Sequence, residues 1–295
     1  MHRRIGTGRG RGGLGRPVGI AAGFLGLMVV LALLVAHSTA PSQTVRPVHN
    51  DPILVALASN PNITGDCPWL ARAMARHEPA AVLARLVVGR MTLNEKLSEI
   101  VLTSLGPYEN VNSGVPRLCI PPLTLQDGPQ GLAYGDTGVT QLPAPLGLAA
   151  TFDPALARSY GDVQGAEAAA QGFDVVQGPT LDLVRVPEDG RAFESFGEDP
   201  LLAADMGVAD IDGIQSHRVM AQAKEFAVYN QETDRGALDD QVSDRPLEEL
   251  YLRPFEAAVK RGHVASVMCA YPQLNGAYQC QDASLLGLLD QWGFT

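Results

Sequence analysis

The sequence has few charged residues, and hardly any of them are lysine. Charged residues make up 18% of the 295 residues, and only three of these are lysine. The net charge is −10, and the first seventeen residues contain five arginines and no acid, so the remainder carries −15. A body with this much negative charge is repelled by phosphate backbones, so we do not expect nucleic acid as a partner.

Spacings typical of metal and cofactor sites are also missing. The sequence contains no Cys-x-x-Cys and no His-x-x-x-His pair. No Gly-x-Gly-x-x-Gly phosphate loop follows the first predicted strand. We therefore expect neither a metal nor a cofactor.

Only four cysteines are present, namely Cys67, Cys119, Cys269 and Cys280. Four cysteines allow three disulfide connectivities. The last two lie close enough in sequence to connect a strand to the loop after it, which leaves Cys67 with Cys119. Four buried thiols without any disulfide are the alternative that the sequence leaves open.

The arginine-rich start is followed by residues 18–36, which contain no charge. A basic segment followed by an apolar one is typical of an export signal. Ser38-Thr39-Ala40 offers small residues for cleavage. Nineteen apolar residues can also span a bilayer, so an uncleaved membrane anchor is the second possibility. Both predict a secreted or extracytoplasmic protein that contacts a membrane only through residues 18–36.

Three segments follow from composition and pattern. Residues 1–40 are the predicted signal or anchor. Residues 41–78 form a linker and N-terminal extension, rich in Pro, Ser and Asn over 41–66. Residues 79–295 form the folded domain, which begins with a helix predicted over 79–104 and interrupted near Gly89. Within that helix, Thr92-Leu93-Asn94-Glu95 has the form of a capping box.

From residue 122 onward, short apolar segments alternate with longer helical ones. Asp153-Pro154 and Asp199-Pro200 are typical helix starts, with Asp as the cap and Pro in the first turn. The pattern predicts strands near 122–125, 173–176, 219–226 and 264–270, alternating with helices near 153–172, 199–217, 246–261 and 283–292.

This alternation indicates an α/β fold with a parallel sheet that is covered on both faces. Polar and Gly-rich clusters follow the strands, where a (β/α)8 barrel carries its functional residues. A doubly wound sheet is the competing architecture, and it usually has a Gly-rich phosphate loop after its first strand. We count about four βα units, so the sequence predicts an incomplete (β/α)8, or TIM-like, barrel.

Five phrases in the sequence resemble, in the same order, phrases of glycoside hydrolase family 3. They are "LTLQDGPQG", "GRAFESFGEDP", "AKEFAVYNQETDR", "PLEELYLRPFEAAV" and "VMCAYPQLNG". The resemblance covers roughly residues 85–295 and is greatest to the β-glucosidase branch. It implies a barrel followed by an α/β sandwich domain. It also implies hydrolysis of β-glycosides with retention, through an aspartate nucleophile on the barrel.

The resemblance assigns sugar-binding roles to several residues. Asp127 would grip two sugar hydroxyls, although an Asp in a Gly-Pro turn often serves only its own local hydrogen bonds. Arg191 would reach into the pocket, although an ordinary surface ion pair is possible. Lys224 would bind sugar hydroxyls. Glu198 and Asp199 are interpreted as structural.

Position 225 departs from the family, because Glu225 stands where histidine is expected. A carboxylate accepts a hydrogen bond from a hydroxyl but cannot donate one. It would also add negative charge close to a nucleophilic aspartate. We therefore expect that Glu225→His would raise activity.

Arg235 would steady the nucleophile and Tyr271 would line the approach to it, unless Tyr271 only packs in the core.

The resemblance identifies no catalytic residue within this sequence. It implies that the nucleophile lies just beyond Thr295 and that the acid/base residue belongs to a later domain. We interpret the chain as part of a β-glucosidase whose substrate is a β-linked glucoside or oligosaccharide. The alternative is a non-catalytic remnant that binds sugars weakly.

Overall fold

The computed structural model describes residue 67 and residues 75–105, 108–133 and 135–294. All of them belong to one compact unit, Asn50–Thr295. The predicted signal or anchor, its apolar run 18–36 and most of the linker lie outside the described residues. Within the described part, no helix combines the length and the apolar character needed to cross a bilayer.

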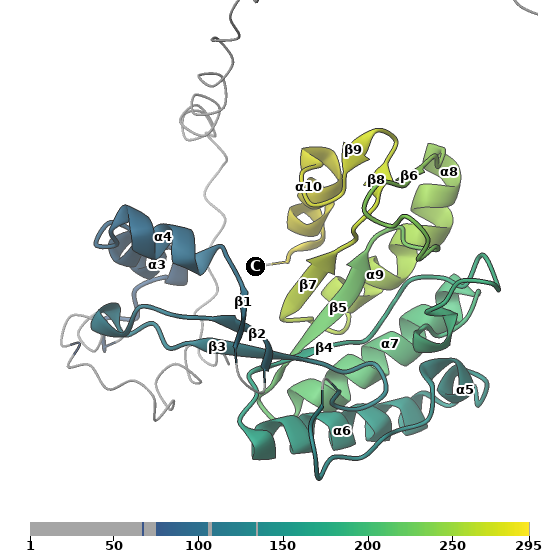
Figure 1. The fold of residues 1–295 in the computed structure, drawn as a ribbon, viewed down its shortest axis with the longest axis horizontal. Coiled ribbons are helices and arrows are strands. Elements are labelled where there is room, and N and C mark those ends of the chain that lie inside the picture. Colours follow the sequence, from purple (N-terminus) through teal and green to yellow (C-terminus); the bar gives the residue numbers. More distant parts are fainter. Residues whose placement is uncertain (1–66, 68–74, 106–107, 134, 295) are drawn as a thin grey trace, which may run out of the picture. The chain divides into compact units, whose positions relative to one another are not determined.

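A six-stranded sheet forms the centre of the fold, with the strand order β1-β2-β3-β4-β5-β7 (Figure 1). The first three strands pair antiparallel, and β3, β4, β5 and β7 pair parallel. A small second sheet has the order β6-β8-β9. The strands are β1 (Thr103–Leu105), β2 (Tyr108–Asn112), β3 (Leu123–Asp127), β4 (Val175–Gln177), β5 (Met220–Phe226), β6 (Asp239–Asp240), β7 (Ser266–Cys269), β8 (Gln273–Leu274) and β9 (Ala277–Tyr278).

Helices follow each of the four parallel strands, which confirms the predicted βα alternation. The main pairs are β3 with α6, β4 with α7, β5 with α9 and β7 with α10. The α-helices are α3 (Ala80–Val88), α4 (Leu93–Glu99), α5 (Pro145–Ala149), α6 (Pro154–Gln171), α7 (Pro200–Gln215), α8 (Asp244–Pro246), α9 (Leu252–Lys260) and α10 (Ala283–Trp292). Shorter turns are η2 (Pro116–Leu118), η3 (Ala192–Glu194) and the π-helical η4 (Leu247–Tyr251).

Local side-chain chemistry explains where the long helices begin and end. Asp153, Asp199 and Asp282 each accept hydrogen bonds from two backbone N–H groups of the first turn of their helix. These bonds satisfy donors that have no partner inside the helix. Gly172 and Gly293 end α6 and α10 in the left-handed conformation, with φ of 81° and 88°.

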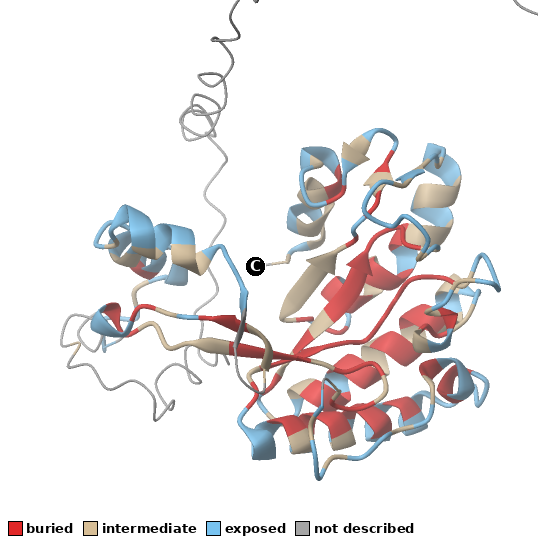
Figure 2. Ribbon diagram, viewed as in Figure 1, coloured by how far each residue is buried: buried red, intermediate tan, exposed pale blue. Residues whose placement is uncertain are grey.

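The core lies between the parallel strands and the helices that cover them. Figure 2 shows buried residues gathered on β4, β5, α6 and α7, whereas α3 and α4 are largely exposed. Val176 and Ala223 are completely buried. Helices α6 and α7 approach so closely that a Cβ atom on Gly213 would lie 2.2 Å from the carbonyl oxygen of Arg158. Close packing of this kind makes the interface between the two helices intolerant of added atoms.

The first predicted helix is only partly correct. Its interruption at Gly89 and its capping box, with Thr92 and Glu95 bonded reciprocally, are confirmed. The prediction that it continues to residue 104 is wrong, because α4 ends at Glu99 and Thr103–Leu105 forms strand β1. Strand β1 exists through its antiparallel pairing with β2, a contact that helical periodicity does not reveal.

Two disulfides lie in the described residues, and they are the pairs favoured from the sequence. Cys269 at the end of β7 is joined to Cys280 just after β9, with Cα atoms 5.4 Å apart. Cys67 is joined to Cys119, with Cα atoms 6.4 Å apart.

Candidate functional site

The structure brings the six sequence-predicted site residues to the carboxyl ends of the parallel strands and the loops that follow them. This edge is where βα barrels place their functional groups. Asp127 ends β3, Lys224 and Glu225 lie near the end of β5, Arg191 and Arg235 lie in the loops after β4 and β5, and Tyr271 follows β7.

Asp127 and Lys224 form the first ion pair of the site. Lys224 Nζ donates to Asp127 Oδ1 at 2.5 Å. The lysine side chain is only 3% exposed, whereas the aspartate is 32% exposed. A buried lysine requires such a partner, and the pairing holds the carboxylate in one orientation while leaving part of it accessible.

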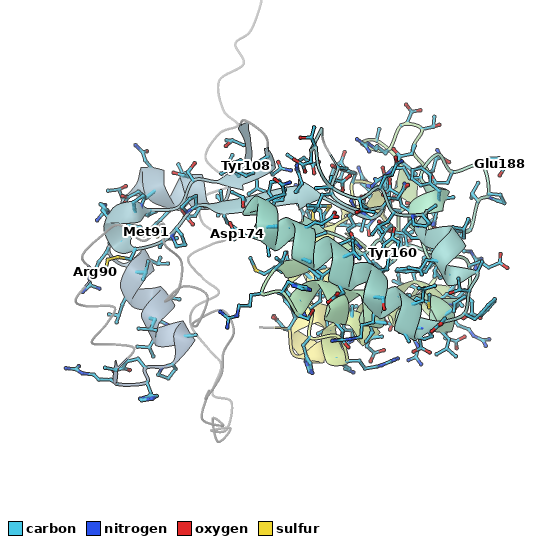
Figure 3. All side chains as sticks on the ribbon, turned by 90° about the horizontal axis from the view of Figure 1, so that it is seen from below. Arg90, Met91, Tyr108, Tyr160, Asp174 and Glu188 are labelled. Atoms are coloured by element: carbon cyan, nitrogen blue, oxygen red, sulfur yellow. A yellow bond between two sulfur atoms is a disulfide. The ribbon has the colours of Figure 1, made fainter. Side chains whose placement is uncertain are left out.

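The loop after Asp127 is fixed by a residue of α6. Figure 3 labels Tyr160 on that helix, and its hydroxyl lies 2.9 Å from the carbonyl oxygen of Pro129. The same hydroxyl lies 2.7 Å from the carbonyl oxygen of Pro143. Helix α6 therefore supports the backbone that follows Asp127.

Glu225 and Arg191 form the second ion pair. Arg191 Nη1 donates to Glu225 Oε1 at 2.6 Å, and the glutamate side chain is 2% exposed. Arg191 also pairs with Glu194 at 2.9 Å and approaches Glu232 at 3.6 Å. Burial raises the pKa of Glu225, while Arg191 and Lys224 oppose that rise. The negative charge that the sequence introduces at position 225 therefore has an adjacent cationic partner.

Asp182 supports Glu225 and was not predicted. Its Oδ2 atom accepts a hydrogen bond from the backbone N–H of Glu225 at 2.5 Å. Burial raises the pKa of Asp182 well above its usual value, and the nearby Glu225 carboxylate raises it further. The available signal was an acid within the apolar run Leu181-Asp182-Leu183, because an acid buried in such a run requires a specific partner.

Tyr229 connects the two arginines of the site and was also missed. Its hydroxyl accepts from Arg235 Nη1 at 3.2 Å, and Arg191 Cζ lies 5.7 Å from its ring centroid. Arg235 Cζ lies 4.7 Å from the ring centroid of Tyr271. Tyr271 is 52% exposed, which contradicts the alternative that it only packs in the core.

Carboxylate oxygens without a hydrogen-bond partner are concentrated at this site. The described residues include four such buried atoms here: Glu109 Oε2, Asp182 Oδ1, Glu225 Oε2 and Glu232 Oε1. Among the same residues, no three His, Cys, Asp or Glu side chains are grouped to hold a metal ion. The site combines acceptor oxygens with the donors Lys224 and Arg235, which suits a neutral ligand rich in hydroxyl groups.

The chain belongs to glycoside hydrolase family 3. Residues 62–295 match the family described as "Glycosyl hydrolase family 3 N terminal domain". The resemblance found in the five sequence phrases is therefore confirmed, and the α/β fold matches that of the TIM-like N-terminal domains of the family.

Both β-glucosidases and an arabinopyranosidase are similar to this chain. A β-glucosidase of Bacteroides ovatus is 38% identical over 231 residues, which cover 74% of this chain and 30% of that protein. An exo-α-(1→6)-L-arabinopyranosidase of Bifidobacterium longum is 36% identical over 218 residues, or 69% of this chain and 28% of that protein. A β-glucosidase from Streptomyces venezuelae, solved in complex with D-glucose, is 43% identical with a TM-score of 0.67, covering 72% of this chain and 27% of the other. This chain thus spans less than a third of the length of each.

Proposed function

We propose that this chain supplies the sugar-binding part of a β-glucosidase-type glycoside hydrolase. The observation that carries the proposal is the arrangement of Asp127, Lys224, Arg191 and Glu225 at the strand ends, in a family member similar to an enzyme solved with D-glucose. The substrate is a β-linked glucoside or oligosaccharide.

Each residue has a role that its chemistry allows. Asp127 accepts hydrogen bonds from two sugar hydroxyls, because an ionised carboxylate has two acceptor oxygens. Lys224 orients Asp127 and donates to a hydroxyl of its own. Arg191 and Glu225 form the buried wall behind the sugar, and Tyr271 with Arg235 lines the exposed entrance.

Bond cleavage requires further carboxyl groups. A retaining glycosidase uses a nucleophile and an acid/base residue about 5–5.5 Å apart. We infer that residues 1–295 contain neither of them, because in the family pattern the nucleophile follows the segment that ends in "WGFT" and the acid/base residue belongs to a second domain. On this proposal residues 41–295 bind the sugar but do not cleave it.

We also propose that the protein is exported. The uncharged run 18–36 after five arginines supports an export signal or anchor. The pairing of Cys67 with Cys119 and of Cys269 with Cys280 suits an oxidising compartment.

A sugar-binding protein without catalysis is the second candidate. The observation that favours it is Glu225, which replaces the expected histidine and is held by Arg191. In that case the DNA following the codon for Thr295 would contain a stop codon, whereas an enzyme requires an in-frame continuation through a nucleophile.

A panel of chromogenic glycosides tests the proposed activity. We expect the full gene product to cleave an aryl β-glucoside faster than an aryl β-xyloside or an aryl α-arabinopyranoside, and Asp127→Ala to abolish this cleavage. Residues 41–295 alone should bind glucose without turnover. Any turnover by residues 41–295 alone, or undiminished cleavage by the Asp127→Ala variant of the full gene product, would contradict the proposal.

A further inference from the structure

Glu109 lies at the same edge of the sheet as the candidate site. Strand β2 runs antiparallel to β3, so Glu109 near the start of β2 lies beside the carboxyl end of β3, which is Asp127. The backbone N–H of Glu109 donates to Gln126 Oε1 at 3.0 Å, and Gln126 is completely buried. Tyr108, labelled in Figure 3, packs edge-on against Phe173 at 5.7 Å and anchors the strand on the core.

The charged groups of the site act electrostatically on the Glu109 carboxyl group. Burial raises the pKa of Glu109, the Asp127 carboxylate raises it further, and Lys224 and Arg191 lower it. Four charged side chains from β2, β3, β5 and the loop after β4 are therefore within electrostatic reach of one another. Lys224 donates to Asp127, and Arg191 donates to Glu194 and Glu225. Among the described residues, neither cation donates to Glu109 Oε2.

One oxygen of Glu109, Oε2, is buried and has no hydrogen-bond partner. A buried acceptor left unpaired is costly, so such atoms in folded proteins are usually satisfied by a partner or a ligand. Because Glu109 and Asp127 lie at the same edge of the sheet, a hydroxyl group of the sugar is a suitable donor.

We propose that Glu109 is an additional ligand for a sugar hydroxyl at this site. The inference rests on the proposed function and extends it, because Glu109 is outside the set of residues that the family resemblance assigns. Glu109 accepts the hydroxyl hydrogen bond and thereby adds to the selectivity of the site for one hydroxyl position of the ring. If Glu109 only supported the fold, its replacement would change the stability of the protein and would not single out one hydroxyl group of the sugar.

Isothermal titration calorimetry tests this inference, with D-glucose and its 2-, 3-, 4- and 6-deoxy analogues as the probes. The proteins are the wild type and the variants Glu109→Ala, Glu109→Gln, Asp127→Asn and Glu249→Ala. Glu249 is exposed on η4, where it pairs with Arg245, so Glu249→Ala is the matched control. Thermal melts of each variant report its folding.

We expect Glu109→Ala to weaken glucose binding about 10-fold, the size typical of one lost hydrogen bond to a charged acceptor. Glu109→Gln should retain part of the affinity because its amide keeps an acceptor oxygen. For one deoxy analogue, wild type and Glu109→Ala should bind equally, since the hydroxyl that Glu109 contacts is missing.

Three results would overturn the inference, the third together with the proposed function. If Glu109→Ala binds glucose like the wild type while Asp127→Asn loses binding, the site binds sugar without Glu109. If Glu109→Ala weakens every deoxy analogue to the same extent, Glu109 contacts no particular hydroxyl. If the wild type binds no glucose at all, the proposed function fails, and this inference fails with it.

Discussion

Lys224 shows how a single side chain can organise the site. It is one of three lysines in the chain and the one that lies almost fully buried at a strand end, with its ammonium group bonded to Asp127. A buried ammonium group is tolerated only when it is paired, so Lys224 and Asp127 each fix the position of the other. The next residue, Glu225, repeats this arrangement with Arg191.

The first prediction concerns Lys224→Met. The variant removes one donor to the sugar and leaves Asp127 without its partner, so we expect the affinity for glucose to fall by about 10-fold or more. Isothermal titration calorimetry measures this directly. Lys260→Met is the matched control, because Lys260 is 48% exposed and pairs with Glu256 on the surface of α9. Equal losses in the two variants would show that the effect is not specific to the site.

Helices α6 and α7 pack closely against each other, so substitutions at their interface should affect stability strongly. Asp210 of α7 is buried at this interface, where its Oδ1 atom accepts from Gln164 Nε2 at 3.3 Å. Burial alone raises the pKa of Asp210 well above its usual value. Folding therefore favours the protonated form of this carboxyl group.

The second prediction is a pH dependence of stability caused by Asp210. Because the folded-state pKa of Asp210 is raised, its protonated carboxyl group contributes stability at low pH, and this contribution is lost as the pH rises from the unfolded-state pKa through the folded-state pKa. Asp210→Asn carries no charge, so its stability relative to wild type should grow with pH by up to about 1.4 kcal/mol per pH unit. Urea unfolding between pH 5 and pH 9 measures the difference.

The control for that series lies on the same helix. Asp205 is 40% exposed and pairs with Arg261 at 2.7 Å, so Asp205→Asn should show no such growth. If the stability difference between Asp210→Asn and wild type were the same at every pH, Asp210 would have to be ionised throughout the range.

The third prediction compares two helical glycines. A Cβ atom on Gly213 would lie 2.2 Å from the carbonyl oxygen of Arg158, so Gly213→Ala forces α6 and α7 apart and should cost about 2 kcal/mol or more. A Cβ atom on Gly287 in α10 would have no neighbour within 4 Å, so Gly287→Ala should be neutral or stabilise the helix by up to about 1 kcal/mol. Thermal or urea unfolding of both variants measures these changes in stability. The close approach of the helices would be refuted by equal stability of the two variants.

At the scale of the whole molecule, local chemistry determined what could be predicted. Helices α6, α7 and α10 were located correctly, and for α6 and α7 the Asp cap followed by Pro in the first turn is a signal that acts within a few residues. The hairpin of β1 and β2 and the sheet of β6, β8 and β9 were missed, because short strands exist only through pairing with distant partners. The side-chain contacts of the site likewise depend on partners that are distant in the sequence.

The predicted site residues came from recognised phrases, and the structure brings them together at one edge of the sheet. The phrases did not reveal what each residue contacts. Nothing in the sequence indicated that Arg191 pairs with Glu225, that Asp182 holds the Glu225 backbone, or that Tyr229 connects two arginines. Such contacts depend on the three-dimensional arrangement of four strand ends, which periodicity and spacing do not encode.

Asp127 should bind sugar hydroxyls at this edge of the sheet, and titration of D-glucose into wild type and Asp127→Asn measures its contribution. Asp162→Asn is the control, because Asp162 is 60% exposed and pairs with His217 away from the site. We predict measurable binding by wild type and by Asp162→Asn, with a loss of about 10-fold to 100-fold in Asp127→Asn, the range for a hydrogen-bonded charged group. Identical dissociation constants for wild type and a folded Asp127→Asn would show that Asp127 does not bind the sugar.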